Sequence, residues 1–253
     1  MRFYWRSDDD PLTDYGEWLG RIDRKNRQPG TSAPTLAQTW SGPLDLLGAL
    51  GGVPELANLV VRSVTAEQKA TFDTYGGNVR NHDVVLRAST PADESVIVCV
   101  EAKAGESLGD PIANQRQQAE AALAKNPRSK AVLRLDDLLT RLCRYPADDP
   151  RPNALQYQLL TGWAGTLADA DGHHHAVFAV HEFRTDERPA DKTGHNRQAL
   201  DRFADAVLRC ELPDHGPPWC VRVPDINEVD ARLYLAHVVT DLRGARINRP
   251  AAG

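Results

Sequence analysis

The chain has 253 residues, of which 41% are hydrophobic and 26% are charged, and these ordinary values exclude a disordered or fibrous protein. Its apolar runs are all far shorter than the roughly 20 residues that span a bilayer, and its first ten residues lack the hydrophobic region of a signal peptide. We therefore expect a soluble cytoplasmic protein with no membrane partner. The formal net charge of −5 counts against a broad nucleic-acid-binding surface but leaves room for a local basic groove.

The first half of the chain predicts short helices, then a meander of strands, then a helix. Leucines at helical spacing indicate one or two short helices between residues 38 and 61. Strands are predicted at residues 69–75, 82–88 and 95–104, and the last is nearly all apolar up to Val100, as in a strand covered on both faces. Asp110 as N-cap and Pro111 then open a helix to about residue 125, whose inward side chains we expect to be Ile112, Ala119, Ala122 and Leu123.

The second half predicts further helices and at least two more strands. Residues 129–143 indicate a strand or turn that runs into a helix, and residues 154–170 indicate a helix. A buried strand at 175–183 should complete the sheet, followed by a helix at about 196–209, a strand at 219–224 and a segment of mixed character at 230–242. Residues 1–40 and 184–253 carry no pattern from which we can infer a role.

An acid and a lysine stand where the most apolar predicted strand ends. Side chains alternate along a strand with a period of two, so Glu101 and Lys103 project from one face about 7 Å apart. Asp83, near the start of the preceding strand, can face them if the two strands pair. Two carboxylates and a lysine supply the ligands for a hard cation and a group that activates water, which is what phosphodiester hydrolysis needs. The alternative is an ordinary solvent-exposed ion pair of Glu101 with Lys103.

The segments RNHDVVLRA and VIVCVEAKAG resemble the signature of the PD-(D/E)XK nuclease superfamily, an acid on the second core strand and (D/E)xK on the third, followed by a helix. The resemblance implies a restriction-endonuclease-like α/β fold, with a central mixed β-sheet flanked by helices and a helical insertion. As one domain over 1–253, the chain would have its core at 43–125 and 176–183, a mainly helical insertion at 126–175 and a C-terminal extension at 184–253. The resemblance also implies Mg²⁺ or Mn²⁺ held by Asp83, Glu101 and Ala102, with Lys103 helping to activate water.

Members of this superfamily often add an acid before the motif and a glutamine or lysine on the helix after it. Glu67 and Glu55 are the upstream candidates, and we prefer Glu67 because it lies nearer the predicted strand pair. Downstream, we prefer Gln115 to Gln118 because Gln115 lies nearer the apolar stripe of its helix. Glu106 follows the motif strand and is a further candidate. An exposed surface position is the alternative for each of them.

We expect a metal-dependent nuclease that cleaves nucleic acid, in the first place DNA, and the resemblance suggests a role in bacterial defence against phage. A homodimer would suit cleavage of both strands. The alternatives are a non-catalytic restriction-like module that binds nucleic acid or a protein partner, and hydrolysis of another phosphoester. A zinc-protease motif at His181–Glu182 is rejected because Thr185 stands where HExxH requires histidine. The run His173–His175 reads as a loop, and GxSxG and GxxxxGK[ST] motifs are absent.

Overall fold

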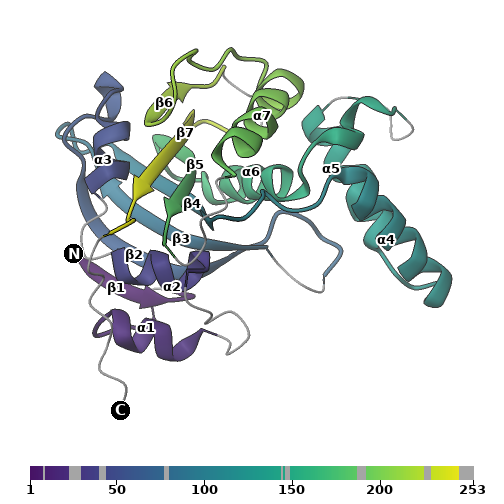
Figure 1. Cartoon of the computed structure of the whole chain (residues 1–253), viewed down its shortest axis with the longest axis horizontal. Coiled ribbons are helices and arrows are strands. Elements are labelled where there is room, and N and C mark those ends of the chain that lie inside the picture. Colours follow the sequence, from purple (N-terminus) through teal and green to yellow (C-terminus); the bar gives the residue numbers. More distant parts are fainter. Residues whose placement is uncertain are drawn as a thin grey trace.

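The structure is a computed structural model and describes residues 1–7, 9–22, 30–39, 44–76, 80–143, 145, 149–186, 192–224 and 229–244. Within these residues, seven strands form one mixed sheet in the order β1-β2-β3-β4-β5-β7-β6 (Figure 1). The strands are β1 Arg2–Trp5, β2 Val60–Ala70, β3 Arg80–Ser89, β4 Ser95–Ala104, β5 His175–Arg184, β6 Trp219–Arg222 and β7 Arg232–Asp241. The expected α/β fold, a central mixed sheet flanked by helices, is confirmed.

The sheet is built around β4, the strand that carries the Glu101–Lys103 motif. Strands β2, β3 and β4 pair antiparallel, while β4, β5 and β7 run parallel to one another. Every residue from Val96 to Ala104 is buried. The strand is therefore covered on both faces, as its continuous apolar run predicts.

Helices cover both faces of the sheet and form two cores. On one face lie α1 Tyr15–Arg21, α2 Ser32–Thr39 and α3 Leu44–Leu50, and on the other lie α5 Ala131–Cys143, α6 Tyr157–Asp169 and α7 Thr193–Phe203. The short turns are η2 Pro54–Leu56, η3 Arg151–Ala154 and the π-helical η4 Ala204–Leu208. Helix α4, Ile112–Lys125, projects from the body of the molecule (Figure 1). None of the described helices has the length and apolar character needed to cross a membrane.

Helix α6 lies directly on the sheet because two glycines face it. A Cβ atom on Gly162 would lie 2.6 Å from Cζ of Phe178, and a Cβ on Gly165 would lie 2.7 Å from Nε2 of His82. Any larger residue would push the helix away from β3 and β5, since packed interiors have no room for added methyl groups. The close approach fixes where the first turn of α6 stands relative to the ends of β3 and β4.

Three strand predictions need correction or extension. The prediction of a strand at 69–75 is wrong, because the strand before β3 is β2, whose partners on β3 run from Ser89 opposite Val60 to Arg80 opposite Ala70. Pairing with β3 decides this register. Within residues 44–61, all of which the structure describes, the helical parts are α3 and η2. The mixed segment at 230–242 contains β7, and β1, β6 and β7, outside the expected core ranges, all join the sheet.

The helix after the motif also differs in detail from expectation. Asp110 is not its N-cap; the cap is Pro111, because the Asp110 carbonyl instead accepts a hydrogen bond from the backbone N–H of Tyr157 at 3.0 Å. Ile112 and Ala119 are buried as expected, but Leu123 is 38% exposed because this part of α4 projects beyond the core. Residues 126–175, the expected helical insertion, contain α5, η3 and α6, and residues 131–143 are helical throughout.

Candidate active site

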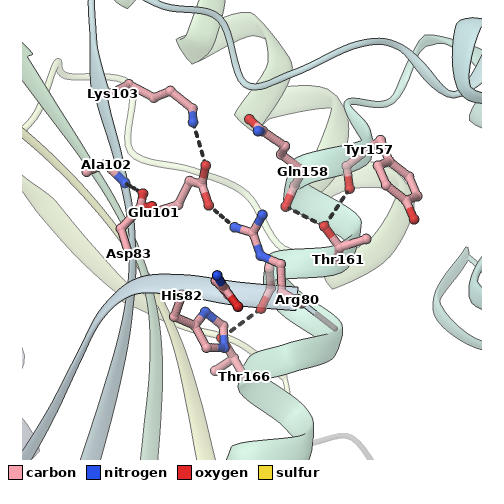
Figure 2. Close-up of polar contacts among 12 residues, drawn as sticks. Arg80, His82, Asp83, Glu101, Ala102, Lys103, Tyr157, Gln158, Thr161 and Thr166 are labelled. Atoms are coloured by element: carbon pink, nitrogen blue, oxygen red, sulfur yellow. Dashed lines mark hydrogen bonds and ion pairs between the residues drawn. The ribbon is translucent and has the colours of Figure 1, made fainter. Parts of the chain in front are cut away.

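Asp83 and Glu101 meet where strands β3 and β4 separate. The last paired residues of the two strands are Val84 and Val100, so Asp83 and Glu101 are the next positions along the ladder. The Asp83 carboxylate accepts a hydrogen bond from the backbone N–H of Ala102 at 2.7 Å. This bond replaces a strand-to-strand bond that the diverging backbones no longer make, and it holds the carboxylate beside the β4 motif (Figure 2).

Glu101 and Lys103 share one face and contact each other, as the strand period predicts. Both are buried, with 2% and 5% of their surface exposed, and the Lys103 ammonium donates to Oε1 of Glu101 at 2.5 Å. The second oxygen of Glu101 forms an ion pair with the guanidinium of Arg80 (Figure 2). Burial lowers the pKa of Lys103, and the negative charge of Asp83 acts in the opposite direction. The surface ion pair considered as an alternative is therefore wrong, since these charges lie inside the protein.

Glu67 adds a third carboxylate on the neighbouring strand. Ala66 pairs with Val84 and Gln68 with His82, so Glu67 lies opposite Asp83. Burial, and after it the negative charge of Asp83, raise the pKa of Glu67 to about 7. The Glu67 backbone has a φ of 52°, a left-handed conformation that is uncommon for a residue with a side chain.

The positive φ of Glu67 changes the side-chain alternation of β2. Ala66 packs in the core under α1, α2 and α3, whereas the Gln68 amide, two positions further on, donates to Asp169 at the end of α6 on the opposite face. Residues two apart on a regular strand would share a face. The turn in the strand therefore occurs at the residue that bears the third carboxylate.

One cavity of about 970 Å³ unites these groups. Its lining includes all five residues predicted as catalytic, namely Glu67, Asp83, Glu101, Lys103 and Gln115, together with Glu106. Glu55 lies in η2, and Gln118 is exposed on α4, where it lines a smaller neighbouring cavity; neither lines this one. Glu67 and Gln115 therefore line this cavity, while their participation in a reaction stays a prediction.

The cavity also contains residues to which sequence reasoning gave another role or none. Arg80 at the start of β3 pairs with Glu101, a contact that no local sequence pattern indicates. Tyr157, Gln158 and Arg134 reach the cavity from α6 and α5, which follow the motif by 28 or more residues. Their sequence positions carried no signal, because packing of the helices against the sheet brings them to the site.

Glu182 on β5 extends the row of buried charges beyond Lys103. The two residues are neighbours in the parallel register of β4 and β5. The Glu182 carboxylate contacts Nε2 of His237 at 2.5 Å and accepts a hydrogen bond from the Asn196 amide at 2.8 Å. The same amide donates to the carbonyl of Glu106 at 3.0 Å, which ties the loop after β4 to α7. Glu182 ends an apolar strand as Glu101 does, and this shared pattern could have identified it.

The donor set around Asp83 fits a hard divalent cation. Such cations prefer oxygen ligands, and Glu67, Asp83 and Glu101 offer carboxylates from three adjacent strands. Burial and the charge of Asp83 raise the pKa of Glu67 to about 7, so a cation bound among these acids would favour the ionised form of Glu67 at neutral pH. Ala102, the third predicted ligand, has only its backbone carbonyl to offer. Arg80 and Lys103 both contact Glu101, so at least one contact has to yield before Glu101 can bind a metal.

A second group of possible ligands lies under α6. His82, Cys99 and Asp169 place one ligand atom each within 4.8 Å of one another. His82 and Cys99 are fully buried, and burial raises the pKa of the Cys99 thiol far above its usual range. A metal would need the thiolate, which this environment disfavours. The acid cluster in the open cavity is the more suitable cation site.

Comparison with known proteins assigns the chain to a family. The model of a domain of unknown function, DUF6946, matches residues 11–239. The chain belongs to this family. No curated protein and no solved structure matches it. In this DUF6946 member, every residue that lines the cavity lies inside the matched range.

Proposed function

We propose that this DUF6946 protein is a metal-dependent nuclease. The observation that carries the proposal is the placement of half-buried Asp83 beside buried Glu101 and Lys103 at the ends of two paired strands, on the wall of an open cavity. Buried charges are costly unless they have a function or complete pairing, and the lining of this cavity holds five acids and three cations. The motif in these strands is also the one that resembles the PD-(D/E)XK superfamily.

Each residue has a role in this reaction. Asp83 and Glu101, with the carbonyl of Ala102, would hold Mg²⁺ or Mn²⁺, and Glu67 adds a third carboxylate on the open side of the cluster. The bound cation would supply positive charge at the scissile phosphate. Because burial lowers the pKa of Lys103, its amine can accept a proton from the attacking water. The water oxygen then bonds to phosphorus as the bond to the leaving sugar oxygen breaks.

Two further residues are suited to the substrate rather than to the metal. Gln115, on the first turn of α4, lines the wall of the cavity and can donate to a phosphate or a water. Arg80 has a planar guanidinium suited to phosphate oxygens, and it is available for one once a metal binds Glu101. These groups and Lys103 favour an anionic substrate, for which nucleic acid, in the first place DNA, is our proposal.

The test is cleavage of plasmid, linear and single-stranded DNA and of RNA in Mg²⁺ or Mn²⁺. We expect the wild type to cleave at least one substrate. Lys103→Ala and Glu101→Gln should lower the rate about 100-fold or more while the variants remain folded. Lys125→Ala and Glu120→Gln, at exposed positions of the projecting helix α4, are the matched controls and should cleave like the wild type.

A metal-supplied wild type that cleaves nothing would refute the nuclease. A second candidate would then apply, a non-catalytic module that binds nucleic acid or a protein partner. The observation that favours it is the internal neutralisation of Glu101 by Arg80 and Lys103, which lets the carboxylate stay ionised without a metal.

A further inference from the structure

The cavity extends beyond the acid cluster to a wall that the proposed chemistry does not use. This wall includes the half-buried rings of Phe72 and Tyr157 and the guanidinium of Arg134. A smaller cavity of about 210 Å³ between α4, α5 and α6 adjoins it and shares Gln115, Arg134 and Tyr157 with the first. Tyr157 therefore stands at the junction of two hollows, on the opposite side from Lys103 and Glu101 (Figure 2).

The backbone and neighbours of Tyr157 hold it in place. Its N–H donates to the Asp110 carbonyl at 3.0 Å, and its carbonyl accepts from the Thr161 hydroxyl at 3.1 Å. Arg134 and Arg80 are its cationic neighbours. Arg134 is itself fixed by an ion pair with Asp73 at 2.6 Å. The backbone at Tyr157 is thus fixed, and its half-buried ring lies near two cations, one of which is paired with Asp73.

Amide groups accompany the ring. Gln158 follows Tyr157 on α6, and its side chain lies between the ring and Lys103 (Figure 2). The loop after β4 approaches it so closely that a Cβ on Gly109 would lie 2.8 Å from Cγ of Gln158, and Gly109 has a φ of 79° that favours glycine. An aromatic ring, fixed cations and amides are the groups with which proteins recognise an unpaired base and its phosphate.

We propose that this wall is a subsite for an unpaired nucleotide whose base stacks on Tyr157, so that the substrate is a single strand or a single-stranded end. This inference rests on the proposed nuclease function and names its substrate class. Bases within a duplex are stacked on each other and cannot offer a face to a tyrosine. A cavity of about 970 Å³ is the size of pockets that enclose one small ligand.

The net charge of the molecule also favours a single-stranded substrate over a duplex. A protein that follows a duplex neutralises many phosphates with a broad basic surface, whereas this chain has a formal net charge of −5. Stacking on an aromatic ring needs no such surface, and the cavity lining supplies three cations, Arg80, Lys103 and Arg134. The same lining bears five carboxylates, Glu67, Asp83, Glu101, Glu106 and Asp110, which the proposed cation would partly neutralise. Contacts confined to a few nucleotides are therefore compatible with the acidic total.

The experiment measures binding of the full chain to fluorescein-labelled 12-nucleotide DNA, RNA and blunt duplex DNA of one sequence. Ca²⁺ replaces Mg²⁺ to occupy the oxygen ligands, and a gel verifies that the probes stay intact. We expect both single strands, or one of them, to bind at least tenfold more tightly than the duplex. Tyr157→Leu should weaken this binding about tenfold or more, and Tyr157→Phe should not. Tyr145→Leu, at a ring that stacks on Arg151 outside the cavity, is the matched control.

A second readout uses only the wild type, in case Tyr157→Leu does not fold. A strand with 2-aminopurine should lose fluorescence on binding, because a stacked base is quenched. Equal affinity for duplex and single strands, unchanged binding by folded Tyr157→Leu, or no quenching would overturn the subsite. Binding that requires the Tyr157 ring, without any cleavage in Mg²⁺, would support the subsite and refute the nuclease. Cleavage of duplex DNA that is unchanged in Tyr157→Leu would support the nuclease and refute the subsite.

Discussion

At the scale of single residues, Glu67 carries two separate costs. Its backbone is held at a φ of 52°, and burial together with Asp83 raises its pKa to about 7. Unfavourable backbone conformations and shifted pKa values both concentrate at functional sites. A strand with only a structural role would be more stable with glycine at this position and no acid beside Asp83. These costs are consistent with a site that is complete only when a cation is bound.

Glu67→Gln should change how stability depends on pH. The pKa of Glu67 is raised in the folded protein, so the folded state binds the proton more tightly, and stability from this group is lost as pH rises from about 4.5 towards 7. Without metal, the variant should gain about 1–3 kcal/mol relative to the wild type between pH 5 and pH 8. Urea denaturation at both pH values measures this, with exposed Glu120→Gln as control. Parallel pH profiles for wild type and Glu67→Gln would contradict the buried, coupled acid.

Glu182→Gln should move the pH dependence of cleavage. The charge of Glu182 opposes the lowering of the Lys103 pKa by burial, so its removal should lower that pKa further. If Lys103 acts as the neutral amine, the rising limb of the pH–rate profile shifts to lower pH. Glu94→Gln is the matched control, because Glu94 contacts His175 at 2.9 Å at the other end of β5. A profile that does not move in Glu182→Gln would exclude this influence on Lys103.

The residues of the candidate site differ in how far the sequence could predict them. Asp83, Glu101 and Lys103 lie on consecutive strands, and local alternation is enough to bring them together. Glu182 shares the pattern of an acid at the end of an apolar strand. Tyr157 depends on the packing of a helix more than fifty residues later in the chain, for which no local pattern exists.

At the scale of elements, α6 connects the core to the cavity. Its buried face packs on β3, β4 and β5, and its N-terminal end presents Tyr157, Gln158 and Thr161 to the cavity. Gly162 and Gly165 set the distance between helix and sheet. Changes at these glycines should therefore affect both stability and the position of the cavity wall.

Gly162→Ala should destabilise the protein by about 1–3 kcal/mol, because the added methyl group would overlap the ring of Phe178. Gly48→Ala is the matched control, since a Cβ there meets no atom within 4 Å and alanine favours the helix α3. We expect the control to be neutral or more stable by up to about 1 kcal/mol. Urea denaturation of the three proteins measures their free energies of unfolding. Equal values for Gly162→Ala and wild type would show that α6 can move away from the sheet.

The elements, like the residues, were predictable only in part. Strands β3, β4 and β5 were predicted because continuous apolar runs are typical of strands covered on both faces. The first strand of the meander was misplaced because pairing with β3, and not its own composition, determines where β2 begins. The sequence does not predict β7 as a strand, because its segment mixes polar and apolar residues. Long-range pairing fixes its place between β5 and β6.

At the scale of the whole molecule, the arrangement separates stability from chemistry. Two apolar cores lie on opposite faces of the sheet, and the charged row from Glu67 to Glu182 crosses β2, β3, β4 and β5 beside the cavity. The acidic total is compatible with nuclease activity because the proposed contacts with substrate are confined to this cavity. We therefore propose that the acids of the cavity form a cation site.

The most direct test is to measure Mn²⁺ binding by electron paramagnetic resonance at pH 8, which is above the pKa of Glu67. We predict that the wild type binds Mn²⁺ and that Asp83→Asn weakens this binding at least tenfold. Asp169→Asn, in the other group of possible ligands, should bind like the wild type. Absence of Mn²⁺ binding by the wild type, or binding that survives Asp83→Asn but is lost in Asp169→Asn, would contradict the account.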